Sequence, residues 1–345
     1  MKIKKSELKE ALETVRPGLA TKELIEQSTS FAFSEGAVIT FNDEICLRAP
    51  VPDLQELTGA IRAEEFYQIL TKLDTEEITM VLKDDEVQLK AGKKRAGLKL
   101  AEELTLPFSE INIPKKFIEL GKGIDRALKF VTPAGSTDMS YPILTCVHIT
   151  KNFVEATDRY RIAKYKINTG FEEPILIPVE YIKTILSITP DKYAISEGWI
   201  HFTNKLGVVC SCRLLEGIEK YPDTSNFIED KEGQEMQFPE NVSEIIEAAE
   251  IFGKADYELD SRVDITFKTG KMIIESHSDF GWYKESVSIK YKGDEMQFAI
   301  TPSLFQDILS QNLTFQHLGT ALLFSTENWK YLTMLKNDLE KDKSK

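Results

Sequence analysis

The stretches IRAEEFYQIL at 61–70, IPVEYIKTIL at 177–186 and ITPSLFQDIL at 300–309 decide how this chain folds. In each of them, apolar residues follow one another at intervals of three and four, which places them on one face of a helix. The stretches recur about every 120 residues, and such self-similarity indicates a repeated structural unit. The matching apolar positions are Ile61, Ile177 and Ile300; Phe66, Ile182 and Phe305; Ile69, Ile185 and Ile308; and Leu70, Leu186 and Leu309.

A second amphipathic helix is expected ahead of each stretch, over residues 6–15, about 114–131 and about 239–252. Ser6 is the expected N-cap of the first. The residues expected to face inward are Leu8, Ala11, Leu12 and Val15; Phe117, Leu120, Ile124, Ala127 and Leu128; and Val242, Ile245, Ile246 and Ala249.

Segments of alternating polar and apolar residues separate the helices. They cover 37–51, 153–167 and 271–289, followed by hairpin-like runs at 77–92, 192–215 and 321–334. Such alternation, with turn sequences such as Asp-Asp and Glu-Gly, is typical of antiparallel hairpins. Each unit therefore reads helix, strands, helix, strands, which predicts an α+β domain with both helices on one face of the sheets. The predicted domains are 1–108, 109–232 and 233–345.

The composition is that of an ordinary soluble globular protein, with 345 residues, 42% hydrophobic and 29% charged. The four cysteines form no Cys-x-x-Cys pair, and Cys210 and Cys212 alternate as on one face of a strand, so we expect free thiols in a reducing cytoplasm. No apolar run follows the basic start at 1–5 or is long enough to span a membrane, so neither a secretory signal nor membrane association is expected. The tail, 336–345, is almost wholly charged.

The net charge of −13 argues, taken alone, against a nucleic-acid partner, because phosphates are neutralised by Lys and Arg. The basic residues are nevertheless concentrated on the polar faces of the first two leading helices, where they would attract phosphates without reading bases. The leading helix of the third unit is acidic instead, with Glu240, Glu244, Glu247 and Glu250.

The second unit carries three motifs of a known family. ATDRYRIA at 156–163 resembles the Ala-Thr-Asp-Gly-His-Arg-Leu-Ala signature of bacterial DNA polymerase III β subunits, the β sliding clamps. YPILTCVHI at 141–149 and LLEGIEKYPDTSNFI at 214–228 resemble two further segments of that family, and the resemblance extends over essentially the whole chain. Arg159 and Tyr160 replace the usual Gly-His, and this divergence favours a phage- or plasmid-type member.

The resemblance implies three similar domains of the DNA-clamp fold, with antiparallel sheets outside and two helices per domain lining a central hole. Two subunits would close into a homodimeric ring that encircles double-stranded DNA and binds the replicative DNA polymerase and a clamp loader. It implies a non-catalytic processivity factor without cofactor or metal. The side chains that would face the DNA are Lys4, Lys5, Lys9, Lys22, Lys115, Lys116, Lys122, Arg126, Lys129 and Tyr141.

Sliding clamps bind a short linear peptide of their partners in a groove between the second and third domains. The resemblance places Leu144, Thr157, Arg161, Ile162, Pro222, Phe227, Leu332, Met334 and Leu335 in that groove. Phe227 is bulkier than the usual aliphatic residue, and Leu335 replaces a proline. For the dimer interface, the resemblance implies Ala96, Leu98, Leu100, Ile251 and Phe252.

Two other functions stay open at this point. A carboxylate-dependent hydrolase would need an enclosed pair of carboxylates, for which Asp158 is a candidate, although a hydrogen-bonding role at the strand end suits it better. The four histidines show no metal-ligand spacing with a cysteine, and no phosphate-binding glycine loop is present. A scaffold protein that keeps the clamp fold without forming a ring would need no basic inner helices.

Overall fold

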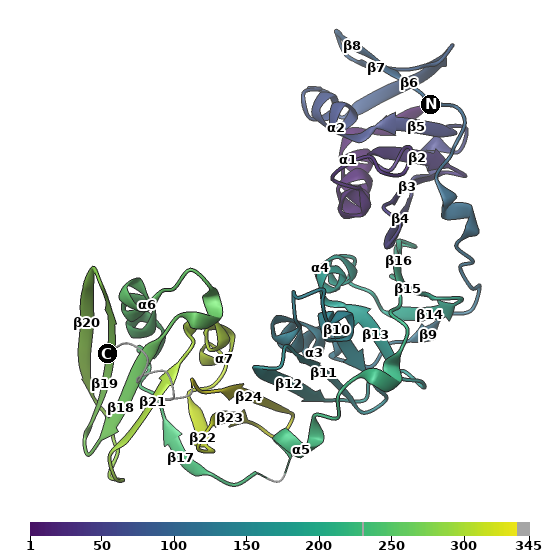
Figure 1. Ribbon diagram of the computed structural model, residues 1–345. Coiled ribbons are helices and arrows are strands. Elements are labelled where there is room, and N and C mark those ends of the chain that lie inside the picture. The colour runs from purple at the N-terminus through teal and green to yellow at the C-terminus, as the bar shows by residue number, and fades with distance from the viewer. Residues whose placement is uncertain (230, 337–345) are drawn as a thin grey trace. The chain divides into compact units, whose positions relative to one another are not determined.

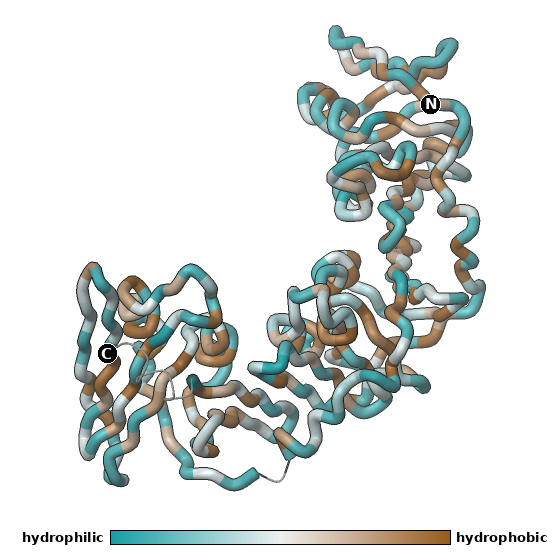
Figure 2. The backbone as a smooth tube through the Cα atoms, viewed as in Figure 1, coloured by the Kyte–Doolittle hydropathy of each residue, from teal (hydrophilic) through white to brown (hydrophobic). Residues whose placement is uncertain are grey.

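A computed structural model describes residues 1–229 and 231–336. The chain divides into two compact units, the first made of 1–125 and 170–216, the second of 126–169 and the residues from 217 onward. Figure 1 shows the elements of both, and Figure 2 shows apolar residues along the strands and helices of each. Among the described residues, no helix is long and apolar enough to cross a membrane.

The first unit holds two antiparallel sheets. Its helices are α1 (Lys5–Val15), α2 (Ala63–Thr71) and α4 (Val179–Ser187). One sheet has the order β1-β6-β7-β8, and the other the order β5-β2-β3-β4-β16-β15-β14-β9. The strands are β1 (Lys2–Lys4), β2 (Ser30–Ser34), β3 (Ala37–Phe41), β4 (Ile45–Pro50), β5 (Gly59–Arg62), β6 (Glu77–Lys83), β7 (Glu86–Ala91), β8 (Lys94–Lys99), β9 (Ile118–Glu119), β13 (Ile175–Pro178), β14 (Lys192–Ser196), β15 (Trp199–Thr203) and β16 (Val209–Arg213).

The second unit is built in the same way. One sheet contains the order β10-β11-β12-β24-β23-β22-β17, and another has the order β20-β19-β18-β21. The strands are β10 (Cys146–Ile149), β11 (Phe153–Thr157), β12 (Arg161–Lys166), β17 (Gln234–Gln237), β18 (Val263–Lys268), β19 (Lys271–Ser278), β20 (Gly281–Ser288), β21 (Met296–Ile300), β22 (Thr314–His317), β23 (Ala321–Ser325) and β24 (Trp329–Met334). Its helices include α5 (Ser225–Ile228), α6 (Val242–Gly253) and α7 (Gln306–Leu309), and α3 (Ile124–Val131) begins where the two units divide.

The strand order shows the threefold repeat directly. Over the described residues, β1-β6-β7-β8 recurs as β9-β14-β15-β16 and as β17-β22-β23-β24, each time eight strands later. The strands β2-β3-β4 recur likewise as β10-β11-β12 and β18-β19-β20. Consecutive copies are joined by equivalent strands, β4 with β16 in the first unit and β12 with β24 in the second. The predicted mixture of helices and antiparallel hairpins is confirmed.

The three deciding stretches each begin in a strand and continue into a helix. Phe66, Ile182 and Phe305 are buried as predicted, and the first two copies continue as α2 and α4. In the third copy, a 3-10 turn at Pro302–Leu304 precedes the four-residue α7. Phe305 has φ −109° and ψ −22°, which interrupts the regular helical geometry between them.

The predicted second leading helix, about 114–131, is wrong over its first half. Only Ile124–Val131 is helical, as α3, and Ile118–Glu119 forms the short strand β9 that pairs with β14. Gly123 has φ +83°, a conformation that no helical residue adopts, so the helix can begin only after it. Lys115, Lys116 and Phe117 therefore precede the helix and do not lie on it.

The other two leading helices are confirmed, except for one cap. α1 buries Leu8, Ala11, Leu12 and Val15, and α6 buries Val242, Ile245, Ile246 and Ala249. Ser6 is not the N-cap of α1, because the helix begins at Lys5, and Lys4, two residues before Ser6, occupies the cap position. Ser6 instead uses its backbone N–H and hydroxyl to bond the Glu76 carboxylate.

The β4–β16 joint buries three thiols. Cys46 lies opposite Ser211, and Cys210 and Cys212 flank that residue in β16. None of the three is in a disulfide and all are buried, and burial raises the pKa of the Cys46 thiol to about 12. Cys46 and Cys210, whose pKa burial raises, therefore pack as small apolar side chains and are not nucleophiles at neutral pH.

His201 makes the stability of the first unit depend on pH. It is buried in β15, with Ser196 Oγ 2.8 Å from Nε2 and Ser211 Oγ 2.8 Å from Nδ1, and burial lowers its pKa from 6.5 to about 4. The unfolded chain binds more protons between these values, so His201 makes the fold less stable as the pH falls from 6.5 to 4.

We expect His201→Gln to remove on the order of 2 kcal/mol of the stability loss seen between pH 7 and pH 4.5. Urea unfolding at both pH values measures it, with His277→Gln, an exposed histidine, as control. An equal pH dependence in wild type and His201→Gln would contradict the assignment.

Candidate functional site

An apolar cleft of about 670 Å³ lies within the second unit. Four short segments line it, 140–144, 157–162, 220–227 and 332–334. The structure brings together eight of the nine predicted groove residues there, namely Leu144, Thr157, Arg161, Ile162, Pro222, Phe227, Leu332 and Met334. Leu335 is buried outside the lining, where its N–H donates to the Thr320 carbonyl.

The tight turn between β11 and β12 positions Arg159 and Arg161, two polar residues of the cleft lining. Asp158 Oδ1 accepts the N–H groups of Tyr160 and Arg161, both at 2.9 Å, which fixes the turn. Arg159 has φ +79°, the left-handed region in which the related signature has glycine. Asp158 thus shapes the turn, as the hydrogen-bonding interpretation predicts.

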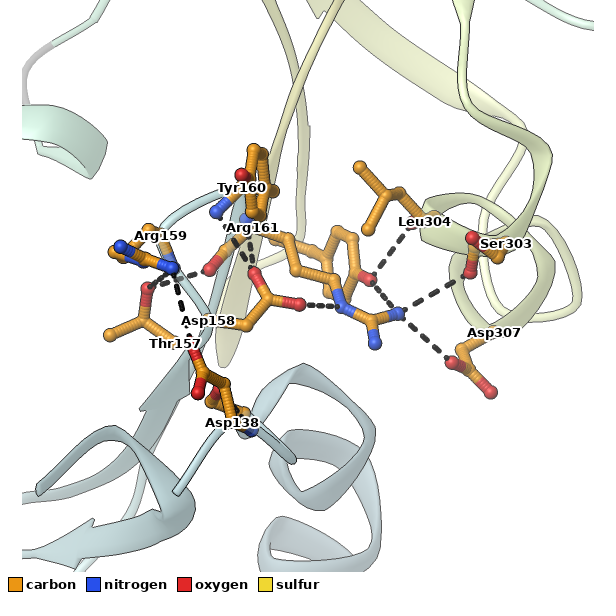
Figure 3. Close-up of polar contacts among 11 residues, drawn as sticks. Asp138, Thr157, Asp158, Arg159, Tyr160, Arg161, Ser303, Leu304 and Asp307 are labelled. Carbon is orange, nitrogen blue, oxygen red and sulfur yellow. Dashed lines mark hydrogen bonds and ion pairs between the residues drawn. The ribbon is translucent and has the colours of Figure 1, made fainter. Parts of the chain in front are cut away.

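Arg161 links this turn to the third copy of the repeat (Figure 3). Its Nε donates to Asp158 Oδ2 at 2.9 Å, and its Nη1 lies 3.4 Å from both the Ser303 carbonyl and Asp307 Oδ2. Because the guanidinium is largely buried, these contacts replace the water it loses. The stretch 300–309 is thereby held at the edge of the cleft.

Tyr331 also contacts the Arg161 guanidinium. Its hydroxyl lies 3.5 Å from Arg161 Nη1 and donates to the Leu304 carbonyl at 3.1 Å. Burial raises the pKa of Tyr331 to about 12, although the Arg161 guanidinium opposes the rise. The phenol therefore stays protonated at neutral pH and keeps its donor role.

Aromatic side chains are exposed at the rim of the cleft, and only some of them are among the nine predicted groove residues. Phe227 is 61% exposed, and Tyr141 and Tyr160 are also exposed. The Arg159 guanidinium stacks 4.2 Å above the Tyr141 ring. It also lies 3.6 Å from Asp138 Oδ2 (Figure 3). Tyr141, which the resemblance assigns to the side chains facing DNA, lines the cleft. Exposed apolar surface around a preformed hollow is typical of a binding site.

The residues predicted to face DNA lie on several elements. Lys5 and Lys9 are on α1, directly after Lys4, and Lys22 is in the loop ahead of β2. Lys122 precedes α3, and Arg126 and Lys129 lie on it. Lys4, Lys22, Lys115, Lys116, Lys122, Arg126 and Lys129 are exposed.

The residues predicted for the dimer interface lie on or near the edge strand β8 and in the helix α6. In the first unit, β8 is an edge strand that carries the half-buried Ala96 and Leu98, and Leu100 after it is buried. In the second unit, Ile251, at the end of α6, is 73% exposed, and Phe252 approaches Gly281 at the start of the edge strand β20. Trp282 of β20 is also exposed.

The chain matches no protein-family model and no curated protein sequence. It is, however, similar over nearly its full length to solved structures. The DNA polymerase sliding clamp of Bacillus subtilis is 20% identical, with a TM-score of 0.81, and the match covers 97% of this chain and 98% of that one. The DNA polymerase III β chain of Streptococcus pneumoniae is also 20% identical, with a TM-score of 0.83 and coverage of 97% and 99%.

The DNA polymerase III β subunit of Thermotoga maritima is 16% identical, with a TM-score of 0.80 and coverage of 97% and 98%. The chain therefore has the fold of the bacterial DNA polymerase III β sliding clamps. The family resemblance predicted this fold, and the low identity fits the predicted divergence.

Tyr331→Phe tests the Arg161 contact. Loss of the hydroxyl removes a buried hydrogen bond and one partner of the guanidinium, so we expect about 1–2 kcal/mol less stability. Urea unfolding measures the change, with Tyr257→Phe as control, because Tyr257 is 77% exposed. Equal stability of Tyr331→Phe and wild type would rule out a stabilising role for this hydroxyl.

Proposed function

We propose that this protein is a DNA sliding clamp, a non-catalytic processivity subunit that acts in the cytoplasm. The observation that carries the proposal is the fold itself, which solved sliding clamps match over nearly the whole chain at TM-scores of 0.80 to 0.83. The apolar cleft in the second unit supports it, because a clamp needs a site that tethers a polymerase. The predicted domains, 1–108, 109–232 and 233–345, are proposed to be the three copies of the repeat, and the recurring strand order supports this.

The way in which the repeats are joined supports the proposal of a homodimeric ring. Strand β4 pairs with β16, and β12 pairs with β24, in each case with eleven strands between the partners. If the same eight-strand period continues beyond the chain, the next partner of this kind is β20. Its partner would then be β8 of a second copy. Both are edge strands within the chain, and pairing β20 of one copy with β8 of a second copy would remove both edges.

The acidic balance of the chain is compatible with encirclement of DNA. A ring is held on DNA by topology, so it needs only weak attraction to phosphates. The exposed lysines of the first two repeats would supply that attraction, since none of them needs to read a base. The exposed glutamates of α6, Glu244 and Glu247, would keep that part of the ring from binding tightly.

The cleft is the proposed docking site for the DNA polymerase and the clamp loader. Its lining is mainly apolar, and Met334 and Phe227 are exposed and free to adapt to a partner. Its polar residues lie at the β11–β12 turn, at Ser140 and in the segment 220–224. A short peptide with two or three apolar anchors fits a hollow of this size and character.

Retention on DNA tests the ring. Loaded protein should stay on circular DNA and slide off the same DNA after linearisation, and its solution mass should be that of a dimer. A protein that is monomeric at micromolar concentration and lost equally from both DNAs would exclude a ring and favour the clamp-fold scaffold.

Peptide binding tests the cleft. The double variant Leu144→Ala, Met334→Ala removes apolar contact area at its centre, so we expect at least tenfold weaker binding of a fluorescein-labelled ten-residue peptide with a Leu-Leu-Phe core. Dimer mass should be unchanged, and Leu206→Ala, an exposed leucine of the first unit, is the control. Equal affinity of the double variant and wild type would refute the groove assignment.

A further inference from the structure

A buried carboxylate lies behind the wall of the cleft. Glu155, in β11, is 3% exposed, between the apolar strand neighbours Val154 and Ala156. His148 of β10 places Nδ1 2.8 Å from its Oε1, and the Thr224 hydroxyl donates to its Oε2 at 2.6 Å. Lys164 of β12 places Nζ 3.7 Å from the same Oε2. One carboxylate thus connects three adjacent strands with the segment that carries Thr224.

That segment, 221–229, forms one wall of the cleft. Pro222, Thr224 and Phe227 line the hollow, so Thr224 has its hydroxyl on Glu155 and is also part of the binding surface. The Tyr221 ring packs on His148 with centroids 4.6 Å apart. Tyr221 and Thr224, which hold the first half of the wall, therefore both contact residues of the Glu155 network.

The far end of the wall is held by other contacts. Ile228 is fully buried in a cluster with Ile162, Leu323 and Leu332. Lys164 Nζ reaches Glu229 Oε1 at 3.1 Å, and Lys330 Nζ donates to the Ile228 carbonyl at 3.2 Å. Apolar packing thus anchors one end of the wall, and the Glu155–Thr224 hydrogen bond anchors the part that contacts the ligand.

Burial of a carboxylate at a strand position lowers the stability of the fold unless the charge is compensated. Removing its charge from water costs several kcal/mol unless partners replace the water, and an apolar side chain of similar volume often gives equal or higher stability. What Glu155 supplies in return is geometry, because its two oxygens accept only donors at defined places. Those donors belong to β10 and to the wall.

We propose that Glu155 is a positioning residue of the cleft, which fixes the wall 221–229 against β10–β12 through Thr224. This inference rests on the proposed peptide-binding function. A wall that is already fixed loses less conformational freedom when a peptide binds, so the network raises affinity without touching the peptide. Glu155→Gln weakens it despite its similar shape, because the amide lacks the negative charge paired with Lys164 and has one acceptor oxygen in place of two.

The test compares variants of the full-length protein with the same labelled peptide, by fluorescence anisotropy. We expect Glu155→Gln and Thr224→Val to weaken binding five- to thirtyfold. Thr224→Ser keeps the hydroxyl and should recover most of the affinity lost in Thr224→Val, which a role in packing alone would not produce. Glu232→Gln, an exposed carboxylate of the same unit, is the matched control.

Hydrogen exchange of the free protein supplies a second measurement. The amides of 221–229 should exchange faster in Thr224→Val and Glu155→Gln than in wild type and Thr224→Ser, with β18–β19 unchanged. Wild-type affinity in folded Thr224→Val, or equal losses in Thr224→Val and Thr224→Ser, would overturn the proposal.

If wild type fails to bind this peptide, its assignment as a ligand of the cleft fails. Exchange at 221–229 then decides the positioning role by itself: unchanged exchange overturns it, and faster exchange supports it.

Discussion

The antiparallel pairing of β12 with β24 is the interaction on which the candidate site depends. It places Ile162 opposite Leu332 and Arg161 opposite Thr333, so residues 170 positions apart become neighbours in one sheet. The cleft lies over this joint, because two of its four lining segments are the paired strands themselves. The Arg161 guanidinium then extends the joint to Ser303 and Asp307, outside the sheet. A change in the register of this pair would separate the lining residues and leave a buried cation without its partners.

Much of the fold could be predicted because its signal is local. The hairpins alternate apolar and polar residues with a period of two, and the helices after β5 and β13 repeat at three and four. The false helix ahead of α3 shows the limit of that reasoning. Phe117, Leu120 and Ile124 have helical spacing, but Gly123 adopts a left-handed conformation and Ile118 pairs with Tyr193 of β14. Spacing alone does not reveal which backbone bonds a segment will form.

The residues of the candidate site could likewise be predicted only in part. The family resemblance supplied eight of the lining residues, since these lie in short recognisable motifs. It did not supply the partners of Arg161 on the third repeat, which are about 140 residues away in sequence and have ordinary side chains. Nor did it indicate Glu155, whose position in an alternating segment reads as solvent-facing. Buried polar networks depend on what packs above a strand, and a pattern within the strand carries no such information.

The joint between β4 and β16 offers an unexpected convenience. Its native cysteines can report on opening of the joint without any engineered label site. Cys46 and Cys210 are shielded while the two strands stay paired, and a thiol-specific dye can reach them only during an opening event. The rate at which such a dye reacts with Cys46 and Cys210 therefore reports how often this joint between two repeats opens.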